Sequence, residues 1–90
     1  MLKEDIYDIN PEALLVDGFD EAIIGMAERI NLGPVVAYDT DKIIKILADD
    51  MDDELDEDTK IALAYEYFEF NILGAWVGDN TPIFINKIEN

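Results

Sequence analysis

The first half of the chain carries two patterns of apolar and polar positions that predict helices. In residues 20–30 the apolar positions 22, 23, 26, 27 and 30 recur at the spacing of one helix face, with acids in the first turn and Arg29 in the last. The sequence Asn31-Leu32-Gly33-Pro34 ends this predicted helix. Residues 10–18 have Asn at a possible N-cap, Pro at the first helical position and Gly just past the end, which predicts a short helical segment. A strand over residues 14–16 is the alternative there.

The middle of the chain predicts one strand followed by two helices. Residues 35–38 form a β-type run that is too brief for a helix. Asp39 or Thr40 can then cap a helix that buries the apolar residues Ile43, Ile44 and Leu47. Residues 59–73 form the longest predicted helix, and their two apolar stripes make an arc wider than a surface helix needs.

The last part of the chain predicts two short strands around a turn. Residues 75–77 and 82–85 are apolar runs on either side of Gly78-Asp79-Asn80-Thr81, and Pro82 stands at a strand start, where a missing N–H is tolerated. The chain shows no internal repeat and no linker. We therefore predict a single small domain over residues 1–90, of the α+β class, with three or four helices and a two- or three-stranded antiparallel sheet.

Composition removes most catalytic chemistry. The 90 residues include no His, Cys, Ser or Gln, which excludes thiol and serine nucleophiles, imidazole bases, disulfides and zinc sites built from Cys and His. We expect a protein that is not an enzyme, with no catalytic residues, no cofactor and no specific metal site.

The charge balance indicates what kind of partner the protein prefers. With 22 acidic and 6 basic residues, the net charge is −16, which repels nucleic acids and anionic lipid at long range. Residues 1–5 lack the basic start and apolar stretch of a signal peptide, and no apolar run approaches the ~20 residues of a membrane span. We expect a cytoplasmic protein that binds basic protein surfaces, with no direct nucleic-acid binding and no membrane contact.

The densest run of charge lies between the last two predicted helices. Eight of the ten residues 49–58 are acids, and they are the candidate partner-binding residues: Asp49, Asp50, Asp52, Asp53, Glu54, Asp56, Glu57 and Asp58. A helix through the run would carry about one charge per 1.9 Å, close to the ~1.7 Å of duplex DNA, and an extended loop about one per 4 Å, near the ~3.4 Å of a single strand. Either geometry would imitate a phosphate backbone.

Two other interpretations of this acidic run remain open. Like charges four residues apart disfavour a continuous helix, so a break is predicted near residues 50–53, with Met51 and Leu55 anchoring the connection to the core. The run is then a solvated connection whose last acids cap the next helix. Calcium binding is a further alternative, but the spacing does not match a calcium loop, so any metal affinity should be nonspecific.

Aromatic residues gather on the longest predicted helix and just after it. Tyr65, Tyr67, Phe70 and Trp76 are the candidate interface residues, and packing in the core is the alternative for the whole group, which includes Phe68. An interface here would make a homodimer possible. Glu66 and Glu69 on the same helix could act as paired carboxylates, but such a pair is usually the polar stripe of an amphipathic helix.

Several blocks of the sequence resemble a family of short, largely uncharacterised proteins encoded by phages and prophages. The resemblance covers about residues 14–85 and is carried by Asp17-Gly18-Phe19-Asp20, Tyr38-Asp39, Glu66-Tyr67-Phe68-Glu69-Phe70-Asn71, Gly74-Ala75-Trp76-Val77-Gly78 and Thr81-Pro82. It implies no particular activity, because the family has no established one. The acidic run departs from the short, moderately polar connection of the family at this point.

Together these features predict a non-enzymatic accessory protein of the phage type that acts in the host cell cytoplasm. It would bind a host protein through its acidic surface as a nucleic-acid mimic, with a defence nuclease or CRISPR effector as the target class. The alternative is a small structural or interaction domain that binds through the aromatic helix and the C-terminal hairpin, with the acidity serving solubility only.

Overall fold

The computed structural model describes residues 3–88, which form three α-helices, two shorter helical turns and a three-stranded sheet. The elements follow one another as α1 (Lys3–Ile9), η1 (Asp20–Ala22), β1 (Ile23–Arg29), β2 (Leu32–Asp39), α2 (Thr40–Asp49), α3 (Glu57–Phe68), η2 (Glu69–Leu73) and β3 (Ile83–Ile85). η2 is a π-helical turn that continues α3. The predicted α+β class is confirmed, with three strands.

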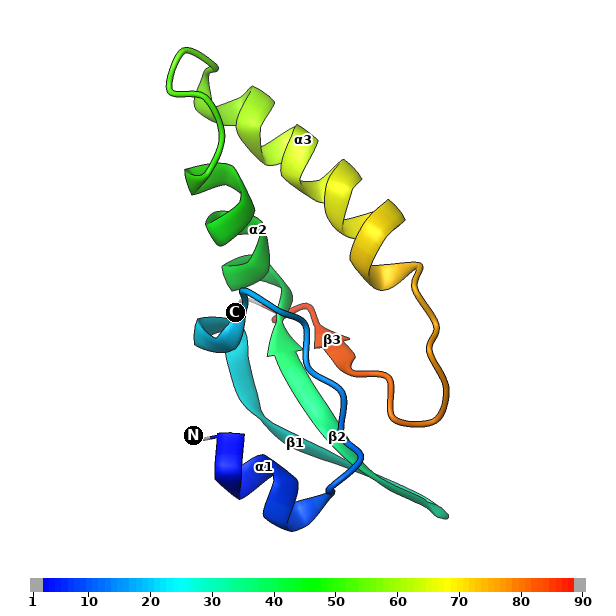
Figure 1. The fold of residues 1–90 in the computed structure, drawn as a ribbon. Coiled ribbons are helices and arrows are strands. Elements are labelled where there is room, and N and C mark those ends of the chain that lie inside the picture. The colour runs from blue at the N-terminus through cyan, green and yellow to red at the C-terminus, as the bar shows by residue number, and fades with distance from the viewer. Residues whose placement is uncertain (1–2, 89–90) are drawn as a thin grey trace.

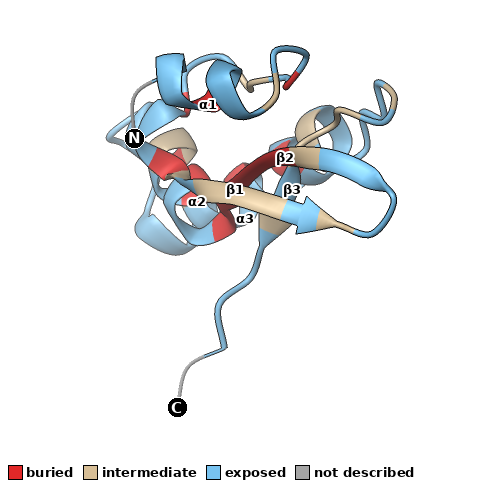
Figure 2. Ribbon diagram, turned by 90° about the horizontal axis from the view of Figure 1, so that it is seen from below, coloured by how far each residue is buried: buried red, intermediate tan, exposed pale blue. Residues whose placement is uncertain are grey.

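The sheet has the order β1-β2-β3 and is mixed rather than antiparallel throughout. β1 and β2 form an antiparallel hairpin with Ala27 opposite Val35, and β3 lies parallel to β2 with Phe84 opposite Tyr38. The central strand β2 is the most buried, since two neighbours cover its edges. α1 lies against one face of the hairpin (Figures 1 and 2).

The α2–α3 hairpin projects from the end of the sheet where β2 runs directly into α2 (Figure 1). The molecule measures 45 × 31 × 22 Å, and its radius of gyration of 14.2 Å exceeds the ~12 Å of a compact domain of this length. The connection between α2 and α3 is therefore held at one far end of an elongated molecule.

The core fastens this helical hairpin to the sheet. Phe68 packs edge-on against Phe84 with 5.3 Å between ring centroids, and Phe84 stacks on Tyr38 at 5.7 Å. The Tyr38 hydroxyl accepts a hydrogen bond of 2.8 Å from the N–H of Val16, so the irregular segment before η1 is tied to the same cluster. Ala64, one turn before Phe68, is fully buried, and its small side chain permits a close approach of α3 to the rest of the core.

Four predicted elements are correct. The run at 35–38 lies within β2, the helix capped by Asp39 is α2, and the long helix is α3 with its continuation η2. The strand predicted over residues 82–85 is β3. Ile43 and Ile44 are buried as expected, and Leu47 is half-buried against the core. The predicted break also occurs, because α2 ends at Asp49 and α3 begins at Glu57.

The helix predicted over residues 20–30 is wrong, because most of this segment is strand β1. Its apolar residues have the spacing of a helix face, but pairing with β2 overrides this local pattern. Ile30 and Asn31 form the loop of the hairpin, where Asn31 adopts a φ of 62°, a left-handed conformation that Asn tolerates better than most residues.

Two further predictions are wrong. Residues 10–18 form turns and irregular chain, neither the predicted helix nor the alternative strand, whereas the helix nearest the N-terminus is α1. Residues 75–77 are not a strand, and β3 pairs with β2 instead of closing a C-terminal hairpin. In the described part of the chain, the helices are all too short, or too polar, to cross a membrane.

Candidate functional site

The eight acids of residues 49–58 gather at the tip of the α2–α3 hairpin (Figure 1). Asp49 ends α2, Glu57 and Asp58 open α3, and the others lie on the connection between the two helices. All eight are exposed. We call residues 49–58 the acidic tip. It brings together every partner-binding residue that the sequence predicted.

Backbone hydrogen bonds from its own acids shape the acidic tip. The Asp52 side chain accepts a hydrogen bond of 2.9 Å from the N–H of Glu54, and Asp56 accepts one of 2.7 Å from the N–H of Thr59 as the N-cap of α3. These hydrogen bonds from the Thr59 backbone and side chain hold the pKa of Asp56 below its usual value, because they favour the ionised form. The predicted capping role of the last acids is thus confirmed for Asp56.

Two other acids of the acidic tip lie close to lysine side chains. Lys45 Nζ lies 3.5 Å from Asp49, and Lys60 Nζ lies 3.7 Å from Asp53. The Lys60 side chain is only 13% exposed, whereas its partner Asp53 is fully exposed. Six of the eight acids have no basic partner within residues 3–88. Four of these six also accept no backbone hydrogen bond there: Asp50, Glu54, Glu57 and Asp58.

The linear charge spacing that would imitate a phosphate backbone is not present. The run is neither one helix nor an extended strand, since it comprises a helix end, a turned connection and a helix start. Like-charge repulsion and the Asp52 and Asp56 side chains both favour the turn. Met51 packs against the core as predicted, whereas Leu55 is 37% exposed and is not a core anchor. The acids form a compact cluster of charged side chains instead of a regular row.

A groove of about 330 Å³ lies between α2 and α3, beside the acidic tip. Its apolar lining comes from Ile44, Ala48, Ile61 and Tyr65. Charged residues from both helices, including Asp49 and Glu57 of the tip, also line it. Sequence patterns gave no sign of this groove, because it depends on how two helices pack.

The candidate interface residues are exposed on α3, on η2 and on the chain that follows, and Tyr65 among them lines the α2–α3 groove. Phe70 is 77% and Trp76 71% exposed, and Tyr65 and Tyr67 are also exposed. Only Phe68 of this aromatic group is buried. At roughly 200 Å² per aromatic side chain, Tyr67, Phe70 and Trp76 together leave on the order of 400 Å² open to solvent.

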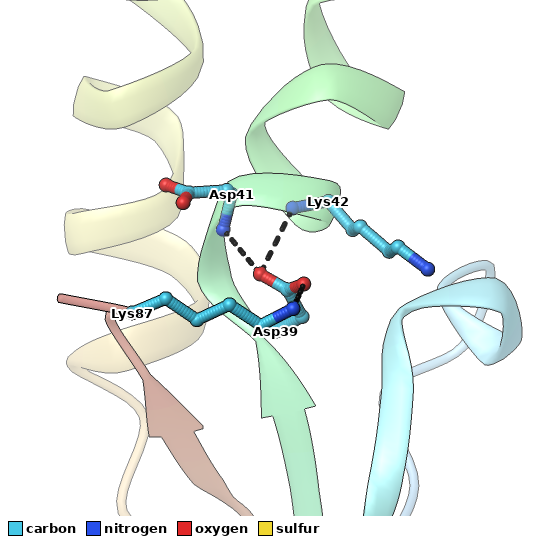
Figure 3. A network of polar contacts seen from close by, with 4 residues as sticks. All are labelled: Asp39, Asp41, Lys42 and Lys87. Carbon is cyan, nitrogen blue, oxygen red and sulfur yellow. Dashed lines mark hydrogen bonds and ion pairs between the residues drawn. The ribbon is translucent and has the colours of Figure 1, made fainter. Parts of the chain in front are cut away.

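An ion pair between the buried Asp39 and the exposed Lys87 lies where β2 runs into α2 (Figure 3). Asp39 ends β2 and caps α2, and its Oδ1 accepts hydrogen bonds from the N–H groups of Asp41 at 3.0 Å and Lys42 at 3.4 Å. Its Oδ2 lies 3.0 Å from Lys87 Nζ. Burial alone would raise the pKa of Asp39, but the Lys87 ammonium and the two N–H groups outweigh it and lower the pKa. Sequence reasoning found the cap and missed Lys87, which lies 48 positions away.

Residues 3–88 contain no group of three or more carboxylates placed to hold a metal ion. Glu66 and Glu69 are both exposed on the surface of α3 and its continuation, and Glu66 lines a shallow depression with Leu63, Tyr67 and Phe70. The structure thus offers exposed binding surfaces rather than an enclosed acid–base pair.

Comparisons with known proteins add nothing to this description of the site. No protein-family model, curated protein sequence or solved structure matches the chain. The resemblance to phage-encoded proteins therefore stays a prediction from sequence blocks.

Proposed function

We propose that the protein is a non-enzymatic binding protein that inserts its acidic tip into a basic cleft of a partner protein. The observation that carries this proposal is the position of eight exposed carboxylates at the far end of a projecting helical hairpin. A projecting group of this kind reaches into a concave site that the body of the protein cannot enter. Lys and Arg side chains that line nucleic-acid clefts would form charge-assisted hydrogen bonds with these carboxylates.

Long-range charge supports the same proposal. The net charge of −16 accelerates association with a cationic surface and disfavours association with nucleic acid. Asp50, Glu54, Glu57 and Asp58 take part in neither the ion pairs nor the side-chain hydrogen bonds of the tip, so they remain available to a partner. The compact shape of the tip favours competition for a phosphate-binding cleft over imitation of a regular duplex.

The target class that fits best is a nuclease or other nucleic-acid-binding effector in the cytoplasm of a host cell. This choice depends on the resemblance to phage-encoded proteins and on the match between clustered carboxylates and phosphate-binding cations. In its concrete form, the proposal is that the partner is a defence nuclease or a CRISPR effector. The protein would inhibit this partner by occupying its cleft and would leave the partner itself intact.

The test compares two triple variants of equal charge. The tip triple variant carries Asp50→Asn, Glu54→Gln and Asp58→Asn, which touch neither the Asp52 and Asp56 hydrogen bonds nor the lysine pairs. The control, called the N-terminal triple variant, carries Asp5→Asn, Asp8→Asn and Glu12→Gln at exposed positions. Both variants have a net charge of −16 + 3 = −13.

Each protein is immobilised and used to capture proteins from a bacterial host lysate, with and without added duplex DNA. We expect a partner that wild type and the N-terminal triple variant retain, that the tip triple variant loses, and that DNA displaces. If both variants retain the partner equally, the acidic tip is not needed for binding. If both variants lose the partner equally, the effect depends on net charge and not on the position of the acids.

A second candidate function is association through the aromatic surface of Tyr67, Phe70 and Trp76. The exposure of Phe70 and Trp76 favours it, because such residues are enriched in the centres of protein interfaces. In this case Trp76→Ala abolishes capture or self-association, and the tip triple variant behaves as wild type. Sedimentation of wild type and Trp76→Ala at several concentrations separates a homodimer from a heterologous complex.

A further inference from the structure

The groove between α2 and α3 has an apolar floor with carboxylates at both ends. Ile44 and Ala48 lie on consecutive turns of α2, and Ile61 of α3 faces the same space. Ile61 is 38% exposed, so part of the floor is open to solvent. A volume of about 330 Å³ is at the lower limit for small-molecule pockets, which suits one large apolar side chain better than a cofactor.

The carboxylates around the groove are spaced along α2. Asp41 and Asp49, both lining the groove, are eight residues apart on one helix, which places them about 12 Å apart along its axis. Ile44 and Ala48 lie between them. Glu57, at the start of α3, adds a third carboxylate near the Asp49 end.

Among the described residues that line the groove, Lys45 is the one cation, and it does not neutralise the carboxylates. Lys45 pairs with Asp49 at 3.5 Å, but both side chains are more than 60% exposed. Exposed pairs four residues apart on a helix contribute little to stability, so an incoming cation displaces Lys45 at small cost. With three carboxylates and one ammonium group, the groove favours a positively charged occupant.

We infer that this groove binds an extended segment of the partner protein in which one large apolar residue is flanked by Lys or Arg two positions away on each side. In an extended chain, residues i−2, i and i+2 point to the same face, and four steps of ~3.3 Å span about 13 Å. This length matches the separation of Asp41 and Asp49 along α2. The apolar side chain then enters between Ile44, Ala48 and Ile61, and each cation meets a carboxylate.

This assignment rests on the proposed function, because it names the segment of a basic partner that binds in the groove beside the acidic tip. It adds a requirement that charge alone does not impose, namely an apolar anchor in register with two cations. A second copy of this chain does not fit the groove, because its net charge is also −16 and like charges repel.

The test uses three short synthetic peptides as probes. The matched probe is acetyl-Arg-Thr-Leu-Thr-Arg-amide, whose Leu and two Arg share one face when the peptide is extended. The shuffled probe, acetyl-Arg-Leu-Thr-Thr-Arg-amide, has the same composition and charge with Leu on the opposite face. The third probe has Ser in place of Leu. Binding is followed by NMR chemical-shift titration of the protein at about 0.15 M salt, where exposed charges are largely screened.

We expect the matched probe to bind about tenfold more tightly than either control, since burial of a Leu side chain contributes that much or more. Shifts should centre on Ile44, Ala48 and Ile61. Equal affinities for the matched and shuffled probes would overturn the inference, and so would an absence of shifts at these residues at about 10 mM peptide, a concentration well above a millimolar dissociation constant.

Two protein variants locate the anchor. Ile61→Ser removes part of the apolar floor and should weaken the matched probe about fivefold, whereas Leu63→Ser, on the same helix but outside the groove, should leave its affinity unchanged. Equal effects of the two would overturn the assignment.

The tip triple variant separates this inference from the proposed function, because its three residues do not line the groove. Its affinity for the matched probe should stay within about twofold of wild type. If the tip triple variant loses the captured partner while the matched and shuffled probes bind equally, the proposed function stands and the groove assignment fails. If the matched probe binds selectively while the tip triple variant retains the partner, the groove assignment stands and the role of the tip fails.

Discussion

The ion pair between Asp39 and Lys87 offers a quantitative test of how the hairpin is held. Asp39 makes one good N-cap hydrogen bond to Asp41 at 3.0 Å, a longer one to Lys42 at 3.4 Å and an ion pair of 3.0 Å. Loss of an N-cap costs about 1 kcal/mol. The Asp39 side chain is 5% exposed but Lys87 is 58% exposed, so the pair should contribute about 1 kcal/mol, above a surface pair and below a fully buried one.

The perturbation is a double-mutant cycle on this pair. Asp39→Asn keeps the cap and removes the charge, and Lys87→Met keeps most of the aliphatic side chain. We expect each single change to lower the free energy of unfolding by about 1 kcal/mol, or about 4–8 °C in melting temperature. The double variant should lose clearly less than the sum, because both changes remove one interaction.

The same pair predicts the direction of a pH effect. Because the pKa of Asp39 is lowered in the folded protein, its contribution is present above the unfolded value of about 3.9 and is lost as pH falls through the folded pKa. Urea unfolding followed by circular dichroism at pH 7 and between about pH 5 and 3 measures both effects. Wild type should lose more stability on acidification than Lys87→Met. Additive single effects at pH 7, together with equal acid sensitivity, would refute the role of the ion pair.

Three further outcomes test the packing. Phe68→Ala should lower the free energy of unfolding, measured in urea, by about 3–5 kcal/mol. Phe70→Ala, two residues later and 77% exposed, should change it by no more than about 0.5 kcal/mol. Similar losses for the two variants would contradict the placement of α3. Tyr38→Phe should lower the unfolding free energy by about 1 kcal/mol, because the N–H of Val16 loses its acceptor; an unchanged midpoint would count against that hydrogen bond. Trp76 is the only tryptophan, so neutral acrylamide should quench its fluorescence almost as fully as that of free indole, and protection would indicate a covered aromatic surface.

The sequence predicted the elements whose signals are local. α2 was found from its cap at Asp39 and its apolar spacing, and the break in the acidic run from like-charge repulsion and the capping acids. The exposed acids of the tip followed directly, because a run of carboxylates has no stable place in a core. These features depend on neighbours within one or two helical turns.

Features that depend on distant partners were not predicted. Residues 23–29 have the apolar spacing of a helix, and their pairing with β2 makes them a strand. The sequence predicts a strand over residues 82–85, where β3 lies, but not its parallel partner β2, more than 40 residues earlier. The α2–α3 groove and the Asp39–Lys87 pair likewise arise from packing between segments that no local pattern connects.

The dissociation constant of the captured partner, measured side by side for wild type and the two triple variants at about 0.15 M salt, tests the role of the acidic tip most directly. We predict binding at least tenfold weaker for the tip triple variant and within about twofold of wild type for the N-terminal triple variant, because only the tip acids meet the cations of the partner. Equal affinities for the two triple variants would contradict the account.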